Sequence, residues 1–272
     1  MCIMSTAKRA DRPTVLVVSE ITIDGRLTIH PGCSSKELMQ FMSHEAEVLL
    51  HKIRTECDAI MVGANTIRID NSFLTVRHVP GKNPIRVIPS ARCNISSHAN
   101  VFSPDARTII ATTHQASKEA MQELEEVGAE IIIVGDTKVD LQTLLERLHT
   151  EYDVNKLMME GGSSLNGQMF SLGLVDNVLL IHMPFIVGGA DTPNFVGAFS
   201  STSVNDLVRL QLDQTYMCGS NLITEYSVLP REARLKTPNA AWRSYSIPLN
   251  NTYTLSNLPE KFQANGFFKN WL

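Results

Sequence analysis

The fold class of this chain is decided by the stretch Lys156-Leu157-Met158-Met159-Glu160-Gly161-Gly162-Ser163-Ser164-Leu165-Asn166. An apolar run ends in an acid, two glycines and two serines before an amphipathic segment begins, which is the order of a strand, a tight turn and a helix. Glycines let the backbone approach a ligand closely, and the first amides of a helix are unpaired donors that suit phosphate. The acid would lie at the carboxyl end of the strand, where open α/β sheets bind ligands, and could accept hydrogen bonds from an amino-substituted ring or a ribose. An ordinary strand–helix turn explains the same stretch equally well.

The composition indicates a globular protein with small-molecule partners. The chain has 272 residues, of which 43% are hydrophobic, and a formal net charge of −4. Its basic residues are scattered, which argues against a nucleic-acid or membrane surface as the partner. The five cysteines are an odd number without a CxxC pair, so they indicate neither a disulfide framework nor a zinc site. No apolar run is long enough for a signal peptide core or a membrane span, and we expect a cytoplasmic protein.

Three regions are expected along the chain. Residues 1–12 are a flexible leader, residues 13–229 are one domain, and residues 230–272 are a C-terminal arm that contains seven aromatic residues. The arm has too few regular apolar periods to form a domain by itself. We expect Trp242 and Trp271 to be buried against the domain or across a dimer, and a disordered extension is the alternative.

Short β-branched runs alternate with helical patterns, which predicts an α/β fold with a mostly parallel sheet and helices on both of its faces. Strands are expected at residues 14–19, 59–63, 85–88, 108–113, 130–134, 156–160 and 177–187. Helices are expected at residues 34–54, opened by the capping box Ser34-Ser35-Lys36-Glu37, and at 117–127, 140–149 and 163–172. Residues 207–213 and 222–229 predict an antiparallel hairpin at the edge of the sheet.

Several common active-site motifs are missing from the sequence. It contains no GxGxxG, no phosphate loop with Lys-Ser or Lys-Thr, no HxE with PCxxC, and no GxSxG. These absences exclude a standard Rossmann enzyme, a kinase, a zinc deaminase and an α/β hydrolase. The remaining candidates are dispersed polar residues at the ends of strands.

Five ordered motifs resemble the reductase family of riboflavin biosynthesis. They occupy residues 19–26 (SEITIDGR), 51–54 (HKIR), 63–77 (GANTIRIDNSFLTVR), 83–90 (NPIRVIPS) and 160–176, which begins with Glu160-Gly161-Gly162. Their order and spacing match over about residues 13–228. The family includes stand-alone reductases of a ribosylaminopyrimidine 5′-phosphate and the reductase half of a bifunctional deaminase-reductase. The resemblance implies a dihydrofolate-reductase-like three-layer fold, NADPH as cofactor, a phosphorylated small-molecule substrate and a homodimer.

The resemblance also implies roles for individual residues. The positions expected to bind NADPH are Thr66, Asp70, Ser90, Gly161, Gly162, Ser163, Ser164, Leu165 and Asn166. The substrate side comprises Arg54, Leu74, Arg77 and Glu160, with the two arginines suited to bind a phosphate through guanidinium forks. The candidate catalytic residues are Glu160, Asp24 and Arg26, and no metal is required.

Local alternatives remain for some of these positions. Arg54 could interact only with the end of its own helix, Thr66 could be a helix N-cap, and Asp70 could be a turn former. The chain departs from the family pattern at Asn71-Ser72, at Pro89 and in the loop at residues 31–35.

The implied chemistry is hydride transfer from nicotinamide to C1′ of the ribosylamino group, in its ring-opened imine form. Asp24, His30 and water are all open as the source of the proton. The alternatives are a related NADPH reductase that acts on a pterin-like or another pyrimidine substrate, and a non-catalytic nucleotide-binding protein of the same fold.

Overall fold

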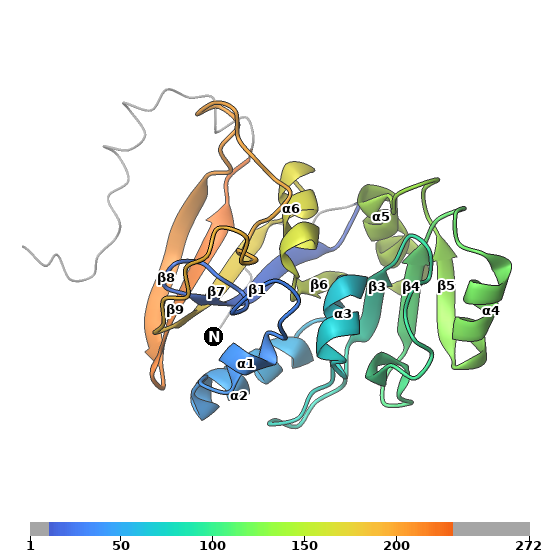
Figure 1. The fold of residues 1–272 in the computed structure, drawn as a ribbon, viewed down its shortest axis with the longest axis horizontal. Coiled ribbons are helices and arrows are strands. Elements are labelled where there is room, and N and C mark those ends of the chain that lie inside the picture. The colour runs from blue at the N-terminus through green and yellow to red at the C-terminus, as the bar shows by residue number, and fades with distance from the viewer. Residues whose placement is uncertain (1–10, 231–272) are drawn as a thin grey trace, which may run out of the picture. The chain divides into compact units, whose positions relative to one another are not determined.

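One sheet organises the domain. The computed structural model describes residues 11–230. Within this range nine strands form a sheet in the order β5-β4-β3-β2-β6-β1-β7-β9-β8 (Figure 1). The strands are β1 (Thr14–Thr22), β2 (Ala59–Met61), β3 (Ile85–Pro89), β4 (Thr108–Thr112), β5 (Ala129–Ile133), β6 (Lys156–Met159), β7 (Asn177–Met183), β8 (Leu210–Cys218) and β9 (Asn221–Val228). Neighbours from β5 across to β7 are parallel, and β9 and β8 are antiparallel, as the sequence predicts.

The central strand β1 shows why the sheet is covered on both faces. Its side chains alternate between two apolar clusters, with Val15 and Val17 in one and Leu16 and Val18 in the other. Because successive side chains of a strand point to opposite faces, an unbroken apolar run requires packing on each side. This is the signature of a buried parallel strand.

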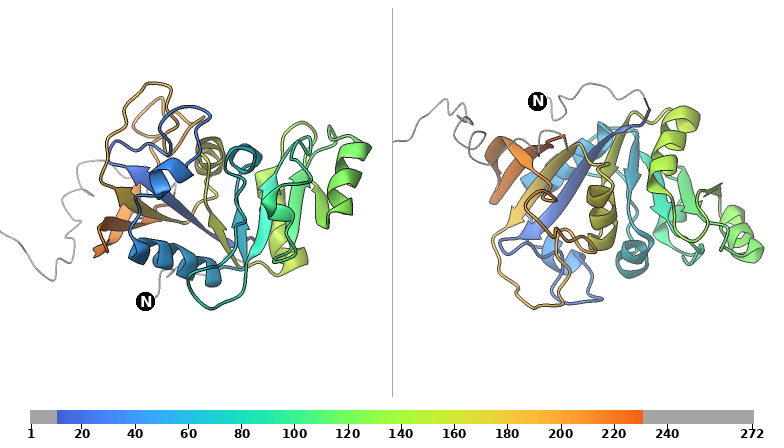
Figure 2. Two further views of the ribbon diagram at one scale, coloured as in Figure 1. Left: turned by 60° about the horizontal axis from the view of Figure 1, so that its bottom comes forward. Right: turned by 90° about the horizontal axis from the view of Figure 1, so that it is seen from above.

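Helices form the two outer layers (Figure 2). They are α1 (Lys36–Met39), α2 (His44–Thr55), α3 (Ala64–Asp70), α4 (Lys118–Glu126), α5 (Leu141–Tyr152) and α6 (Ser163–Ser171), with a 3₁₀ turn, η1, at Asn100–Phe102. The apolar faces of α5 and α6 pack on one side of the sheet. Those of α2, α3 and α4 pack on the other side. The predicted three-layer arrangement is therefore confirmed.

The helix expected at residues 34–54 is wrong, because two helices occupy this segment. Ser43 has an extended backbone and caps α2, with its hydroxyl accepting a hydrogen bond from the Ala46 amide at 3.4 Å. The expected capping box does not form: the N-cap of α1 is Ser35 rather than Ser34, and the Ser35 hydroxyl donates to Asp70 at 2.8 Å, while the Ser34 hydroxyl accepts from the Lys36 amide at 3.2 Å. A tertiary partner has replaced the local one.

The predicted edge hairpin is confirmed, but its first strand lies further along the chain than the expected residues 207–213. Strand β8 runs to Cys218, and a bulge lies between Leu212 and Gln214. Its side chains are exposed along most of its length. An edge strand of this kind carries many polar residues, so its period of two was hidden in the sequence.

Parts of the expected organisation lie outside the described residues. These are positions 1–10 of the predicted leader and residues 231–272 of the predicted arm, including Trp242 and Trp271. Arg12 is buried and ion-paired with Asp176, so the ordered domain includes this residue. Among the helices of residues 11–230, none has the length and apolar character needed to cross a membrane.

Candidate active site

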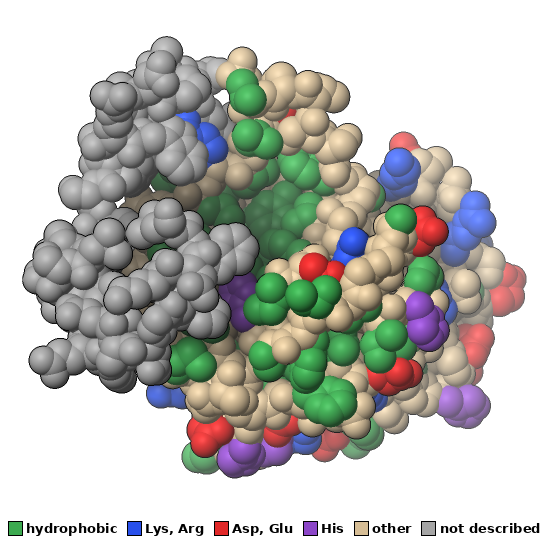
Figure 3. Space-filling model, turned by 60° about the vertical axis from the view of Figure 1, so that its left-hand side comes forward, with side chains coloured by type: hydrophobic (Ala, Val, Ile, Leu, Met, Phe, Trp, Pro, Cys, Tyr) green, Lys and Arg blue, Asp and Glu red, His purple; other side chains and the backbone are tan. Residues whose placement is uncertain are grey.

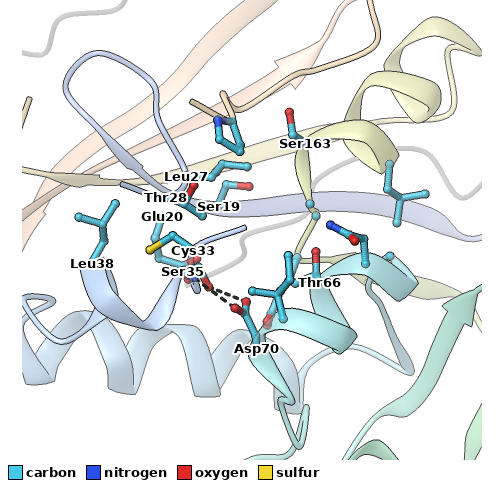
Figure 4. A pocket seen from close by; sticks show the side chains of 18 of the residues that line it. Ser19, Glu20, Leu27, Thr28, Cys33, Ser35, Leu38, Thr66, Asp70 and Ser163 are labelled. Carbon is cyan, nitrogen blue, oxygen red and sulfur yellow. Dashed lines mark hydrogen bonds between the residues drawn. The ribbon is translucent and has the colours of Figure 1, made fainter. Parts of the chain in front are cut away.

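A cavity of 240 Å³ opens at the carboxyl ends of β1, β2 and β6. The side chains labelled in Figure 4 come from segments far apart in the sequence. The site residues expected from the sequence that line this cavity are Thr66, Asp70, Glu160, Gly161, Gly162, Ser163, Ser164 and Leu165.

The turn between β6 and α6 forms one wall of this cavity. Gly161 has a φ of +77°, and Gly162 is the N-cap of α6 without any side-chain hydrogen bond to the helix. The first backbone bond of the helix runs from the Asn166 amide to the Gly162 carbonyl at 3.0 Å. The backbone amides of Ser163, Ser164 and Leu165 are therefore available to an anion. A Cβ added at Gly162 would lie 2.8 Å from the Thr66 hydroxyl, so the close approach of α3 requires a glycine.

Asn166 supports this turn from behind. It is fully buried and does not line the cavity, and its Nδ2 donates to the Phe195 carbonyl at 2.9 Å. The helix is further held by the amide of Gly197, which donates to the Ser163 carbonyl at 3.0 Å. These bonds attach the segment after β7 to the start of α6.

Glu160 is held by a buried ion pair with Arg54. Arg54 Nε and Nη2 each donate to a Glu160 oxygen at 2.7 Å, and Nη1 donates to the Thr75 carbonyl at 2.8 Å. Burial alone would lower the pKa of Arg54, but the Glu160 carboxylate outweighs it and the pKa is raised. Arg54 does not line the cavity, and its guanidinium is committed to protein acceptors. This geometry favours a positioning role over the predicted phosphate fork.

Glu20 is a cavity residue that the sequence analysis missed. Its Oε1 is sealed from solvent and has no hydrogen-bond partner. Burial and, to a lesser extent, the Glu160 carboxylate raise the pKa of Glu20, the Arg54 charge opposes them, and the net result is a pKa of about 7. The available signal was an acid within the apolar strand Thr14–Thr22. Burying a carboxyl group in such a strand costs free energy, and acids of this kind are concentrated at functional sites. Glu20 is therefore a candidate site residue.

Asp70 and Ser90 lie in different surroundings. Asp70 ends α3 and accepts hydrogen bonds from the Ser35 hydroxyl at 2.8 Å and the Ser35 amide at 3.2 Å, which joins α3 to the loop at the cavity mouth (Figure 4). Ser90 follows β3, is buried and does not line the cavity. The structure therefore does not bring Ser90 to the wall that Thr66 and Gly162 share.

Asp24 and Arg26 form a turn beside the cavity rather than part of its lining. The Asp24 carboxylate accepts hydrogen bonds from the Thr22 hydroxyl at 2.6 Å and the Gly188 amide at 2.7 Å, and these bonds lower its pKa to about 2. Arg26 Nη1 donates to the Thr192 carbonyl at 2.9 Å. Both side chains thus tie this turn to the segment after β7.

Leu74 and Arg77 belong to the loop between α3 and β3. Leu74 is buried, has a φ of +52° and packs against α3. The Arg77 amide donates to His51 Nδ1 at 3.2 Å, and no acceptor for its guanidinium is found among residues 11–230. Burial and the nearby Arg54 charge lower the pKa of Arg77. The free guanidinium near the buried pair is therefore that of Arg77.

Comparisons with known proteins agree with the fold. A family model described as the RibD C-terminal domain matches residues 13–224. A relative from Aquifex aeolicus, named 2,5-diamino-6-ribosylamino-4(3H)-pyrimidinone 5′-phosphate reductase, is 46% identical over 80% of this chain and 98% of its own length. A relative of the same name from Methanothermobacter thermautotrophicus is 39% identical over 80% of this chain and 99% of its own length.

A solved structure shows the same architecture. The pyrimidine reductase-like protein from Corynebacterium diphtheriae has a TM-score of 0.67 at 24% identity, covering 81% of this chain and 93% of that protein. The dihydrofolate-reductase-like fold expected from the sequence is confirmed. The chain belongs to the RibD C-terminal domain family.

Proposed function

We propose that this protein is an NADPH-dependent reductase of riboflavin biosynthesis that reduces the ribosylamino group of a pyrimidine 5′-phosphate to a ribitylamino group. One observation carries the proposal. The cavity places uncapped helix amides on one wall and the carboxyl groups of Glu20 and Glu160 on its other lining, which suits an anionic cofactor and an amino-substituted ring. The names of the relatives from Aquifex aeolicus and Methanothermobacter thermautotrophicus support the same substrate, 2,5-diamino-6-ribosylamino-4(3H)-pyrimidinone 5′-phosphate.

The residues of the β6–α6 wall fit a dinucleotide. The open amides at the start of α6 and the glycine forced by Thr66 form a cradle that a larger residue would fill. In the proposal, the pyrophosphate is bound by the segment from Gly161 to Asn166, with Thr66 and Asp70 beside it. When bound, NADPH supplies the hydride. The protein's part is to hold the two reactants close together in a site from which water is excluded.

The preference for NADPH over NADH is part of the proposal. It rests on Ser90 and on Arg92 two residues later, at the same end of the sheet. Arg92 Nε contacts the Gln115 amide oxygen at 3.4 Å, a long bond that a 2′-phosphate could replace. Titration with both cofactors tests the preference, and equal binding of NADH, or unchanged NADPH binding in Arg92→Ala, would contradict it.

Neither Arg54 nor Arg77 lines the cavity, and we assign the phosphate to Arg77 because its guanidinium is free, with a positioning role for Arg54. Glu160 would accept hydrogen bonds from the amino edge of the pyrimidine, because Arg54 holds both of its oxygens in place. Leu74 remains a predicted substrate contact, and it lies in the same loop as Arg77. A guanidinium without a protein partner is the stronger candidate for a dianionic ligand.

Glu20 is our candidate for the proton donor. A carboxyl group with a pKa of about 7 is still protonated in a large fraction of molecules at neutral pH, whereas Asp24, with a pKa of about 2, is ionised. Hydride arrives at C1′ of the ring-opened imine, and the imine nitrogen takes the proton of the Glu20 carboxyl. The Glu20 carboxylate then regains a proton from water.

The homodimer is also proposed, with strand β8 at the interface. Leu210, Leu212 and Met217 are 40%, 41% and 62% exposed on this edge strand. Exposed apolar side chains on a strand that is at the sheet edge among residues 11–230 favour pairing with a second copy. A Met217→Glu variant should shift the protein from dimer to monomer in sedimentation, and an unchanged mass would contradict the assignment. The cytoplasm as location and the arm role of residues 230–272 remain predictions.

A related reductase with a different substrate is the second candidate. Gly32, Cys33 and Ser35 line the cavity, and they belong to the loop that departs from the family pattern. This loop therefore bears on which ring enters the cavity. An activity assay with the purified protein, the diaminopyrimidinone phosphate and NADPH distinguishes the two candidate functions. Formation of the ribitylamino product supports the first proposal, and NADPH binding without turnover favours the second candidate or a non-catalytic protein.

A further inference from the structure

A cluster of potential metal ligands lies on α2, away from the cavity lining. Among residues 11–230, His44, Glu47 and His78 each offer one ligand atom, and these atoms lie within 4.8 Å of one another. His78 Nε2 is 3.7 Å from Glu47 Oε2, and His44 Nδ1 is 4.0 Å from the same oxygen. Figure 3 shows histidine and acidic side chains gathered along the lower edge of this face.

The helix and the neighbouring loop bring these residues together for separate reasons. His44 and Glu47 are three residues apart at the start of α2, so they share one face of the helix. His78 comes from the loop between α3 and β3, and its ring packs edge-on against His51 with centroids 4.8 Å apart. His51 also accepts the hydrogen bond from the Arg77 amide. The loop is therefore held against α2 before any ion binds.

The separations are close to those around a small tetrahedral ion. With bonds of about 2.0–2.2 Å, two ligands on such an ion lie about 3.4 Å apart. The two histidine distances to Glu47 exceed that spacing by about 0.3 and 0.6 Å, and the distance between the two histidine nitrogens exceeds it by no more than about 1.4 Å. His44 is 74% exposed and free to close these gaps. Two imidazoles and a carboxylate suit zinc, cobalt or nickel far better than magnesium or calcium.

We propose that His44, Glu47 and His78 bind a divalent transition-metal ion, with Zn²⁺ the best fit and water completing the coordination. The ion would bridge α2 and the loop that carries Arg77. The charge of Arg77 near Glu47 opposes the cation, while Glu45 in the first helical turn supports it. The proposal does not depend on the reductase activity, because the site uses none of the residues that line the cavity.

Cobalt and zinc are the probes for the test, added to full-length protein freed of any affinity tag. We expect one Co²⁺ per chain with the visible absorption of a tetrahedral site, and competition by Zn²⁺. His78→Ala and Glu47→Gln should each weaken Co²⁺ binding by at least about tenfold. Removing even a hydrogen-bond partner of a metal ligand lowers metal affinity by about this factor, and removing the ligand itself should lower the affinity at least as much. Zn²⁺ should also raise the melting temperature of the wild-type protein.

His114→Ala is the matched control, since His114 is exposed and lies in a distant loop. This variant should bind Co²⁺ like the wild type. Circular dichroism confirms that each variant is folded, and Glu47→Gln preserves the shape of the side chain. Equal Co²⁺ binding in the wild type, His78→Ala and Glu47→Gln would overturn the proposal, and so would the absence of any Co²⁺ absorption in the wild type.

Discussion

Two buried arginine–carboxylate pairs occupy opposite ends of the sheet. Arg12 donates to both oxygens of Asp176 at 2.7 and 3.0 Å, before the first residues of β1 and β7. Arg54 donates to both oxygens of Glu160 at 2.7 Å, at the carboxyl end of β6. The side chains of both pairs are at most 13% exposed. By geometry and burial alone the two pairs are nearly equivalent.

Their neighbours distinguish them. The Asp176 carboxylate also accepts the Val15 amide at 2.9 Å, so it fastens the start of β1 to the start of β7. Glu160 instead lines a cavity that it shares with Glu20, whose Oε1 has no partner. A buried ion pair is therefore weak evidence of function by itself. An unsatisfied buried acid beside the pair is the stronger evidence.

The largest expected effect comes from breaking each pair. Arg12→Met and Arg54→Met should each lower the free energy of unfolding by about 3–5 kcal/mol, because each removes the cation that faces a buried carboxylate. Denaturant unfolding at neutral pH measures both. Only Arg54→Met should also change catalysis, since the Arg54 charge holds down the pKa of Glu20. If Arg12→Met impairs catalysis in the folded enzyme as much as Arg54→Met, the proposed distinction between the pairs is wrong.

Glu20→Gln should lower kcat by about 100-fold, the usual contribution of a positioned general acid. The wild-type rate should fall as the pH rises through about 7, because the Glu20 carboxyl then loses its proton. The variant should lack this alkaline limb while binding NADPH normally. A pH–rate profile and a cofactor titration test both statements. An unchanged kcat with the same alkaline limb would move the proton donor elsewhere.

Arg77→Ala should raise the Michaelis constant for the phosphorylated substrate about tenfold, which corresponds to about 1.4 kcal/mol. The dephosphorylated substrate should be nearly unaffected, because the guanidinium is assigned to the phosphate. Arg68→Ala is the control, since Arg68 is an exposed arginine that donates to the Asn94 carbonyl. Equal responses to the two substrates would assign Arg77 a structural role.

The last prediction concerns stability at alkaline pH. Folding raises the pKa of Glu20 from its usual 4.5 to about 7, so the folded protein keeps a proton there that the unfolded chain releases. Stability should therefore fall between these two pH values, and the penalty should be complete above about pH 7. Glu20→Gln should be more stable than the wild type at alkaline pH, by up to about 3 kcal/mol, and should gain nothing from this group below pH 4.5. Unfolding curves at both extremes measure the difference, and an equal change at both would rule out titration of Glu20 as its cause.

Much of the fold could be predicted because its signals are local. The apolar runs that became β1 and β6 and the Glu160-Gly161-Gly162 turn before α6 are contiguous in the sequence. The helix expected at 34–54 is interrupted at Ser43, which bonds to Cys218 and Asn221, residues that no local pattern connects to it. Local periodicity records which face of an element is apolar, and it carries no information on which distant side chain is the partner.

The sequence by itself determined the α/β class, the mostly parallel sheet, the family and the turn that forms one wall of the cavity. Only the tertiary structure decided that Arg54 is committed to Glu160, that Ser90 lies outside the cavity wall, and that Glu20 faces into it. It also decided that His78 meets α2. The physical reason is that parallel strands gather their carboxyl ends at one edge of the sheet. Residues more than a hundred positions apart then share a single cavity, and their hydrogen-bond partners are set by packing rather than by spacing along the chain.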